Sequence, residues 1–126
     1  MLPTSARLRR SEDFRLVLRR GARAGRHRLV VHAVAGTAPG TEPVRAGFIV
    51  SKAVGNSVVR HRVARRLRHL VAERRGTLPP GSALVIRALP PAAAASSAEL
   101  GGDLDGALRK LRLTEGPRPG AAKDPA

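Results

Sequence analysis

One stretch of the sequence, SKAVGNSVVRHRVARRLRH at positions 51–69, holds the side chains best suited to binding an anion. Within it, Gly55 permits a tight turn, and Asn56 is a good N-cap for a helix that follows. The free backbone N–H groups at such a helix start, with Lys52 beside them, can receive a phosphate group. The stretch therefore predicts an anion-binding turn that leads into a strongly basic helix.

The expected helix gathers basic side chains on one side. Arg62, Arg65 and Arg66 project together because residues three and four positions apart are neighbours on a helix surface. His69 lies on the same side. Such a row can track a phosphate backbone, although a charged helix face is often only the solvated one. Acidic residues usually balance a solvated face, and none occurs here before Glu73, which favours contact with RNA or DNA.

The composition of the whole chain indicates the same kind of partner. Its 126 residues carry 24 Lys and Arg against nine Asp and Glu, a net charge of +15, and all but three of the basic residues are arginine. Such a charge attracts polyanions, and the planar guanidinium fits phosphate oxygens. Nucleic acid is the first interpretation, an anionic membrane surface the second, and a merely basic surface the third.

Several classes of protein and site are disfavoured. Cysteine is absent, so the chain has no disulfide and no thiolate metal site. No apolar run reaches the length of a membrane span or a signal-peptide core, which predicts a cytoplasmic protein with no membrane partner. Ser51 and Ser57 have no partnered base, so nucleophilic catalysis is unsupported. Asp103 and Asp105 are too few for a metal cage and are expected to be exposed helix acids.

The elements that must position the basic stretch follow from hydrophobic periodicity. We expect a first helix over residues 11–20, and two strands at 29–34 and 44–51 that form a hairpin across a turn-rich loop at 38–43. The inner face of that helix consists of Phe14, Val17 and Leu18. One face of the second strand consists of Val44, Ala46, Phe48 and Val50.

The rest of the chain predicts a long helix over 56–75, a third strand over 82–89 and a last helix. The last helix is expected to begin at a capping box formed by Ser96 and Glu99. The apolar stripe of the long helix consists of Val59, Val63, Leu67 and Leu70. The order α-β-β-α-β-α predicts a small sheet covered by helices, an α/β (α+β) sandwich.

These elements predict a single RNA-binding domain over residues 1–113. Residues 1–10 are expected to be a mobile basic N-terminus. Residues 114–126 are rich in Pro, Gly and Ala and are expected to be a disordered tail.

Two of these segments resemble a known family. SKAVGNSVVRHRVARRLR closely resembles the signature of the bacterial ribonuclease P protein family, and LRRSEDFRLVLRRG at 8–21 resembles that family's opening helix. The resemblance implies a ribosomal-protein-S5-domain-2-like fold with a left-handed β-α-β crossover, where general rules alone favour a right-handed one. It also implies a protein subunit that binds a catalytic RNA and the 5′ leader of precursor tRNA and assists removal of that leader. Catalysis then belongs to the RNA with Mg²⁺, and no obligate protein partner is implied.

The resemblance also assigns roles to residues. It places Lys52 and Asn56 at the RNA-binding turn. The basic helix that binds the RNA subunit would use Arg60, Arg62, Arg65, Arg66 and Arg68. The 5′-leader cleft would hold Phe14, Leu18 and Phe48. Phe14 is equally compatible with core packing, and the strand position of Phe48 favours the core.

Some positions depart from the family pattern. His61 stands where the family usually has Asn, and Leu18 replaces a position that is often aromatic. Ala53 and Ala64 stand where Lys is common, which removes two phosphate contacts.

An alternative function is a ribosomal or RNA-chaperone protein without an enzymatic role. A DNA-reading helix is less favoured, because the helix carries no further Asn or Gln past its cap to read adenine edges.

Overall fold

The computed structural model describes residues 11–34, 44–79 and 81–111, and the structural statements below concern these residues. The mobile N-terminus expected at 1–10, the loop expected at 38–43 and the tail expected at 114–126 lie outside the described residues.

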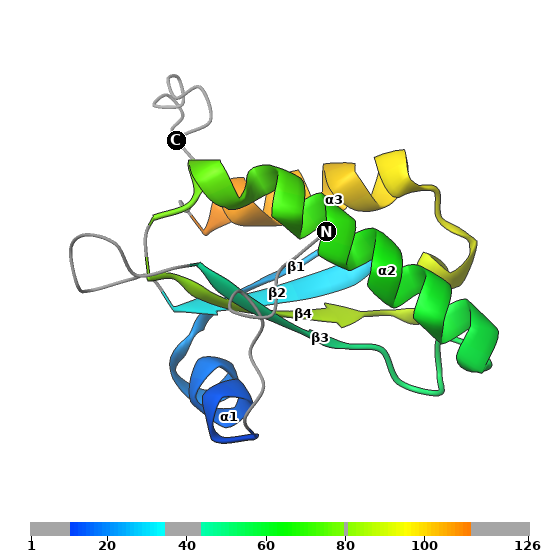
Figure 1. The fold of residues 1–126 in the computed structure, drawn as a ribbon, viewed down its shortest axis with the longest axis horizontal. Helices are drawn as coiled ribbons and strands as arrows, with labels where there is room; N and C mark the ends of the chain where they lie inside the picture. Colours follow the sequence, from blue (N-terminus) through cyan, green and yellow to red (C-terminus); the bar gives the residue numbers. More distant parts are fainter. Residues whose placement is uncertain (1–10, 35–43, 80, 112–126) are drawn as a thin grey trace.

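The described residues form a four-stranded mixed sheet with helices on both faces, which confirms the α+β class. Helices α2 and α3 lie side by side on one face, and α1 lies on the other (Figure 1). The strands run in the order β1-β2-β4-β3, so β1 and β3 are the edges. The elements are α1 Ser11–Arg20, β1 Ala22–Gly25, β2 Leu29–Val34, β3 Arg45–Ile49, α2 Ser57–Arg74, η2 Arg75–Thr77, β4 Ala83–Ala88, η3 Pro90–Ala94 and α3 Ser97–Lys110.

The expected element order lacks one strand, because the sequence does not predict β1. Its segment ARAG is short and has no β-branched or aromatic residue, the types that favour strands. It forms a strand because its backbone pairs antiparallel with β2, which places Ala24 opposite Val31. Both side chains are buried in the core, and the observed order is α-β-β-β-α-β-α.

The hairpin expected between residues 29–34 and 44–51 is wrong. Strand β2 pairs antiparallel with β1 and β4, whereas β3 pairs in parallel with β4. Strand β4 takes the central place because Leu84, Val85 and Ile86 are fully buried, which requires cover on both faces of the strand.

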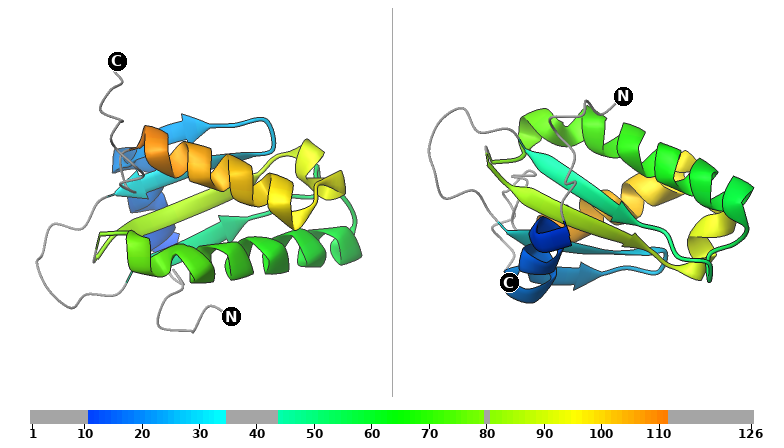
Figure 2. Two further views of the ribbon diagram at one scale, coloured as in Figure 1. Left: turned by 90° about the horizontal axis from the view of Figure 1, so that it is seen from above. Right: turned by 60° about the horizontal axis from the view of Figure 1, so that its bottom comes forward.

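Strands β3 and β4 are neighbouring parallel strands joined by α2. Viewed from the side of α2 with both strands pointing upward, β4 lies to the left of β3, so the crossover is left-handed (Figure 2). This hand is rare among such connections, and it is the hand that the family resemblance implies. Helix α2 packs against β3, so one flank of this helix borders the open edge of the sheet.

Two apolar clusters hold the layers together. The larger one lies between the sheet and helices α2 and α3, and the smaller one lies under α1 around Val17 and Val85. The apolar stripe expected on α2 is confirmed. Val63, Leu67 and Leu70 are buried, and Val59 is half-buried.

Helix α3 begins at the predicted capping box. The Ser96 hydroxyl accepts a hydrogen bond from the Glu99 backbone N–H (3.0 Å), and the Glu99 carboxylate accepts one from the Ser96 backbone N–H (2.9 Å). Gly101 weakens helix propensity but permits close packing. A Cβ there would lie 3.3 Å from Leu70 and 3.1 Å from Arg74 of α2.

Candidate nucleic-acid interface

The turn between β3 and α2 starts the basic helix in the predicted way. The Asn56 side-chain oxygen accepts a hydrogen bond from the Val59 backbone N–H (2.9 Å), which caps α2. Gly55 is needed because a Cβ there would lie 2.8 Å from the Val59 side chain. The Gly55 N–H donates to the carbonyl of Lys52 (3.2 Å), whose side chain is exposed beside the turn.

A cleft of about 320 Å³ opens beside this turn, between α1, β3 and α2. Phe14 of α1 lies so close to Gly47 of β3 that no Cβ would fit between them. The lining residues are Phe14, Ala46, Gly47, Phe48, Val50, Arg60, His61, Ala64 and Arg68. The chain has two phenylalanines and no Tyr or Trp, so this one cleft gathers all of its phenyl rings.

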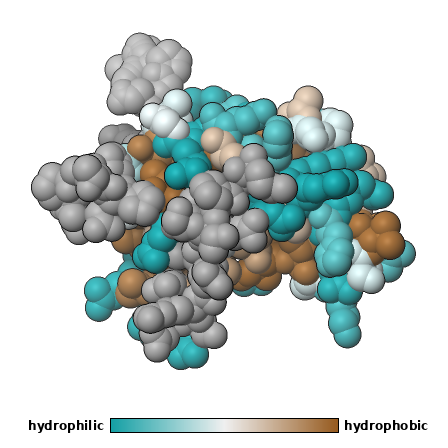
Figure 3. All heavy atoms as spheres, in the orientation of Figure 1, coloured by the Kyte–Doolittle hydropathy of each residue, from teal (hydrophilic) through white to brown (hydrophobic). Residues whose placement is uncertain are grey.

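The cleft combines apolar rings with cations. On the face drawn in Figure 3, hydrophilic side chains follow α2 and adjoin apolar surface at the level of the sheet. Phe14 and Phe48 supply the rings, and Arg60 and Arg68 supply the positive charge. Bases stack on rings while phosphates meet guanidinium groups, so this combination suits a single nucleic-acid strand.

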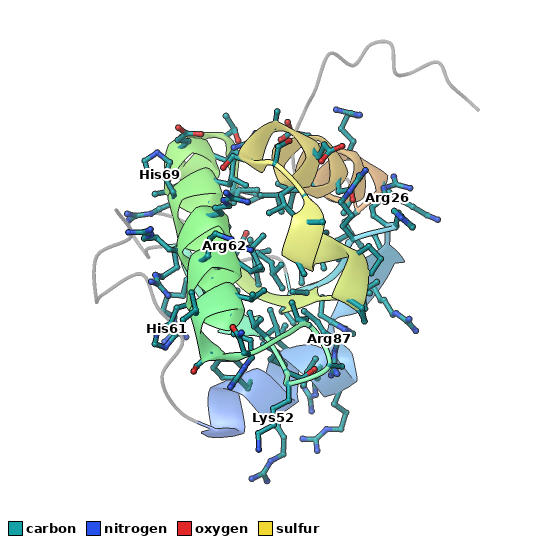
Figure 4. The ribbon with its side chains drawn as sticks, turned by 90° about the vertical axis from the view of Figure 1, so that its right-hand side faces the viewer. Arg26, Lys52, His61, Arg62, His69 and Arg87 are labelled. Atoms are coloured by element: carbon teal, nitrogen blue, oxygen red, sulfur yellow. The ribbon has the colours of Figure 1, made fainter. Side chains whose placement is uncertain are left out.

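The basic residues of α2 do not form the single row that the sequence predicts. Figure 4 shows Arg62 on the side that faces α3, whereas His61 lies on the opposite side of the helix. Arg62 Nη2 donates to the carbonyl of Ala93 (3.2 Å), and Arg66 Nη1 donates to that of Ala95 (2.6 Å). Two of the predicted RNA-binding arginines therefore hold the backbone that leads into α3.

The other predicted cations of α2 face the cleft or the solvent. Arg60 Nε donates to the carbonyl of Gly55 (3.1 Å), which fixes its guanidinium at the cleft. Arg68 also lines the cleft, and its Nε is buried without a hydrogen-bond partner in the part of the chain that the structure describes. Arg65 is exposed. These three arginines and Lys52 are the predicted cations best placed to meet a ligand.

The residues expected in the leader cleft take different positions. Phe14 and Phe48 line the cleft together, and both are half-buried. Each also packs against a core cluster, so core packing is compatible with a place in the cleft lining, and contact with a leader stays a prediction. Leu18 packs beside Val17 and Val85 in the smaller cluster and is not among the lining residues.

Sequence reasoning left five lining residues unassigned: Ala46, Gly47, Val50, His61 and Ala64. Two sequence patterns could have identified some of them as lining residues. Alternation along β3 relates Ala46 and Val50 to Phe48, and the i,i+4 spacing relates Ala64 to Arg60 and Arg68. No sequence pattern signals that the Phe14 ring of α1 lies against Gly47 of β3.

The acidic residues whose side chains the structure describes lie away from this cleft. Asp103 pairs with Arg28, between β1 and β2, with Nη1 and Oδ2 3.3 Å apart. Asp105 pairs with Arg74 of α2, with Nε and Oδ1 2.6 Å apart, and this hydrogen bond raises the pKa of Arg74. The expectation that Asp103 and Asp105 are simply exposed acids is wrong, because they join α3 to the sheet and to α2.

Glu99 and Glu73 also have cationic partners. Glu99 lies 3.4 Å from Arg28, and its pKa is lowered, first by the backbone hydrogen bond from Ser96 and then by Arg28. Glu73 lies 3.4 Å from both His69 and Arg74. Each of the four carboxylates whose side chains the structure describes is thus paired, and none of them lines the cleft.

An arginine-rich helix on a left-handed crossover, set beside an aromatic cleft, is an arrangement typical of a small basic protein of the nucleic-acid-binding class. The family model described as Ribonuclease P matches residues 2–112. The chain belongs to the ribonuclease P protein family.

Individual relatives agree with the family model. The ribonuclease P protein component of Streptomyces bikiniensis is 59% identical over 117 residues, which cover 88% of this chain and 95% of that protein. The solved ribonuclease P protein of Staphylococcus aureus has a TM-score of 0.75 at 20% identity, covering 86% of this chain and 97% of that one. The protein of Thermotoga maritima has a TM-score of 0.69 at 22% identity, covering 87% and 98%. At these identities the two structures establish the fold.

Proposed function

We propose that this chain is the protein subunit of ribonuclease P, which binds a catalytic RNA and the 5′ leader of precursor tRNA and assists endonucleolytic removal of that leader. The observation that carries the leader assignment is the cleft in which Phe14 and Phe48 meet Arg60 and Arg68. Stacking of a base on an aromatic ring contributes about 1–3 kcal/mol and tolerates any base. A subunit that must accept many leaders needs this kind of recognition.

The RNA subunit is proposed to bind along the exposed flank of α2 and the turn before it. Lys52, Arg60, Arg65 and Arg68 would meet phosphates directly. Asn56 acts by capping the helix, since its side-chain oxygen already accepts the Val59 N–H. Arg62 and Arg66 support this surface by fixing the Ala93 and Ala95 carbonyls, and the remaining donors of each guanidinium are available to phosphate.

The chemical step is proposed to belong to the RNA, with Mg²⁺ held mainly by that RNA. Among the described residues, no three His, Asp or Glu side chains lie close enough together to hold a metal ion. The four described carboxylates are engaged with arginine or histidine. The role of the chain is therefore to position substrate and to add positive charge beside the RNA.

The proposed location is the bacterial cytoplasm, where tRNA is made. Within the described ranges, no helix is both long enough and apolar enough to cross a bilayer.

Reconstitution tests this function. Purified chain is added to a bacterial ribonuclease P RNA at low Mg²⁺, and cleavage of precursor tRNA is followed together with the affinity for precursor and for mature tRNA. The expected result is faster cleavage and tighter binding of the precursor than of the mature form. A chain that changes neither quantity is not a ribonuclease P subunit, and sedimentation with ribosomal subunits at a fixed ratio would favour the ribosomal alternative.

A further inference from the structure

The described residues that line the cleft include one imidazole, that of His61. Its side chain is exposed, and Figure 4 shows it on the side of α2 turned away from α3 and from Arg62. The RNA-binding surface proposed above includes this flank of α2 but not His61. A histidine ring gains its positive charge between about pH 5 and 8, so a ring in this place changes the charge of the surface under mild conditions.

The charged neighbours of His61 on its own helix flank and in the cleft lining are three arginines. Arg60 and Arg68 line the same cleft, and Arg65 lies one helical turn further along the flank. The segments around α1 and β3 contribute only uncharged residues to the lining, among them Phe14. Among the described residues, no carboxylate pairs with His61. A proton on this ring therefore adds positive charge to a surface without counter-charge, and an anion is needed to offset it.

His69 carries the same side chain but has a different neighbour. It follows His61 by eight residues and lies on the same side of α2 (Figure 4). Its Nε2 atom is 3.4 Å from the Glu73 carboxylate, so a positive charge on this ring has a partner within the protein. Glu73 follows His61 by twelve residues, which is about 18 Å along the helix axis and too far to pair with it. The two rings therefore differ in whether the protein itself offsets a bound proton.

We propose that His61 binds a phosphate of the RNA subunit in its charged form, so that assembly of the complex takes up a proton at this ring. This inference rests on the proposed function. A phosphate beside the ring favours the charged form, and a hydrogen bond from a charged donor is stronger than one from a neutral donor. The phosphate is assigned to the RNA subunit because the ring is exposed on the flank that continues through Arg65, outside the cleft lining.

The test measures binding of the full-length protein to a bacterial ribonuclease P RNA at about pH 6 and about pH 8, at constant Mg²⁺ and over a range of salt concentrations. His61→Gln keeps a neutral hydrogen-bonding side chain, and His61→Lys carries a charge at both pH values. His69→Gln is the matched control, because it removes the other exposed imidazole from the same side of the helix. Effects of pH on the RNA itself are common to all four proteins. Thermal unfolding at both pH values verifies that each protein is folded.

The expected result is a pH effect that depends on His61. Lowering the pH should tighten binding of the wild type about fivefold more than binding of His61→Gln, because a hydrogen bond to a charged group is the stronger one. The salt dependence of the wild type should be steeper by about 0.9 at the lower pH, which corresponds to one added phosphate contact. His61→Lys should bind at the higher pH as the wild type does at the lower, and His69→Gln should follow the wild type.

Three outcomes would overturn the inference. The first is a pH effect that persists in His61→Gln. The second is an equal loss of the effect in His69→Gln, because the whole flank would then carry it. The third is a pH effect confined to precursor tRNA when preassembled holoenzyme is compared on precursor and mature tRNA, because the phosphate would then belong to the leader. The proposed function is judged separately, by whether the wild-type protein stimulates cleavage of precursor tRNA at the higher pH.

Discussion

The two long sides of α2 differ in whether their arginines pair with a carboxylate. On the side of α3, Arg74 meets Asp105, and Arg62 and Arg66 meet backbone carbonyls. On the side of the cleft, Arg68 has a buried Nε with no partner among the described residues, beside apolar rings. On the α3 side each of these three arginines has a partner within the protein, and the partner of Arg74 is a carboxylate. On the cleft side no described carboxylate pairs with Arg60 or Arg68, which indicates that this side is the better placed to receive an anionic ligand.

The largest expected effect comes from removing a ring on the cleft side. Phe14→Ala should lower the affinity for leader-bearing precursor by about 1–3 kcal/mol, because a stacking surface is lost. Phe14→Leu is the matched variant, since it keeps apolar volume against Gly47 but has no ring. Both variants should bind mature tRNA as the wild type does, as measured by equilibrium binding of the holoenzyme. If Phe14→Leu retains full affinity for the leader, or if both variants unfold at 25 °C, the ring serves the core and not the leader.

On the α3 side, the expected effect is on stability alone. Asp105→Asn weakens the ion pair between Asp105 and Arg74. Both side chains are partly exposed, so the free energy of unfolding should fall by about 1 kcal/mol. In a chain of this size, such a loss lowers Tm by about 4 °C. Thermal unfolding measures the loss, and RNA affinity should not fall. A clear drop in RNA affinity would show that the division between the two sides is incomplete.

Arg65 and Arg66 are adjacent in sequence and should behave differently. Arg65→Ala removes an exposed cation, so the salt dependence of RNA binding should become shallower by about 0.9 with little change in Tm. Arg66→Ala removes the donor to the Ala95 carbonyl and should lower stability by about 1 kcal/mol, with a smaller change in salt dependence. Salt titrations and thermal melts of both variants test this. Identical behaviour of the two variants would contradict the orientation of the side chains described above.

The smallest expected effects are on the pH dependence of stability, which should differ between His32 in the sheet and Glu99 at the start of α3. The pKa of His32 is lowered from 6.5, so the unfolded chain binds this proton more readily, and stability should fall as pH drops below about 6.5. The pKa of Glu99 is lowered from 4.5, so its stabilising contribution is present above that value and is lost as pH falls through the lower folded value. Melts of His32→Gln and Glu99→Gln across pH measure the two windows. A variant whose pH profile matches the wild type in its own window refutes that assignment.

Local sequence signals predicted the helices and strands better than they predicted which strands pair with each other. The caps at Asn56 and Ser96 and the stripe on α2 depend on adjacent residues, and all three are confirmed. Strand pairing depends on distant segments, so the hairpin expectation is wrong and β1 is missed. For the same reason the sequence cannot tell that Arg66 faces α3 while Arg65 faces solvent. That distinction exists only once Ala95 is packed beside the helix.

Among the described residues β3 is an edge strand, and this has a consequence for the behaviour of the protein in solution. Unpaired backbone groups on an edge strand invite pairing with a second molecule. Two copies approaching edge to edge would bring their arginine-bearing α2 flanks together, each on a chain of net charge +15. Electrostatic repulsion between the two copies therefore disfavours self-association through this edge, while a polyanion can still approach it. Added salt shortens the range of that repulsion, so the conditions that release RNA are also those in which the free protein is most prone to aggregate.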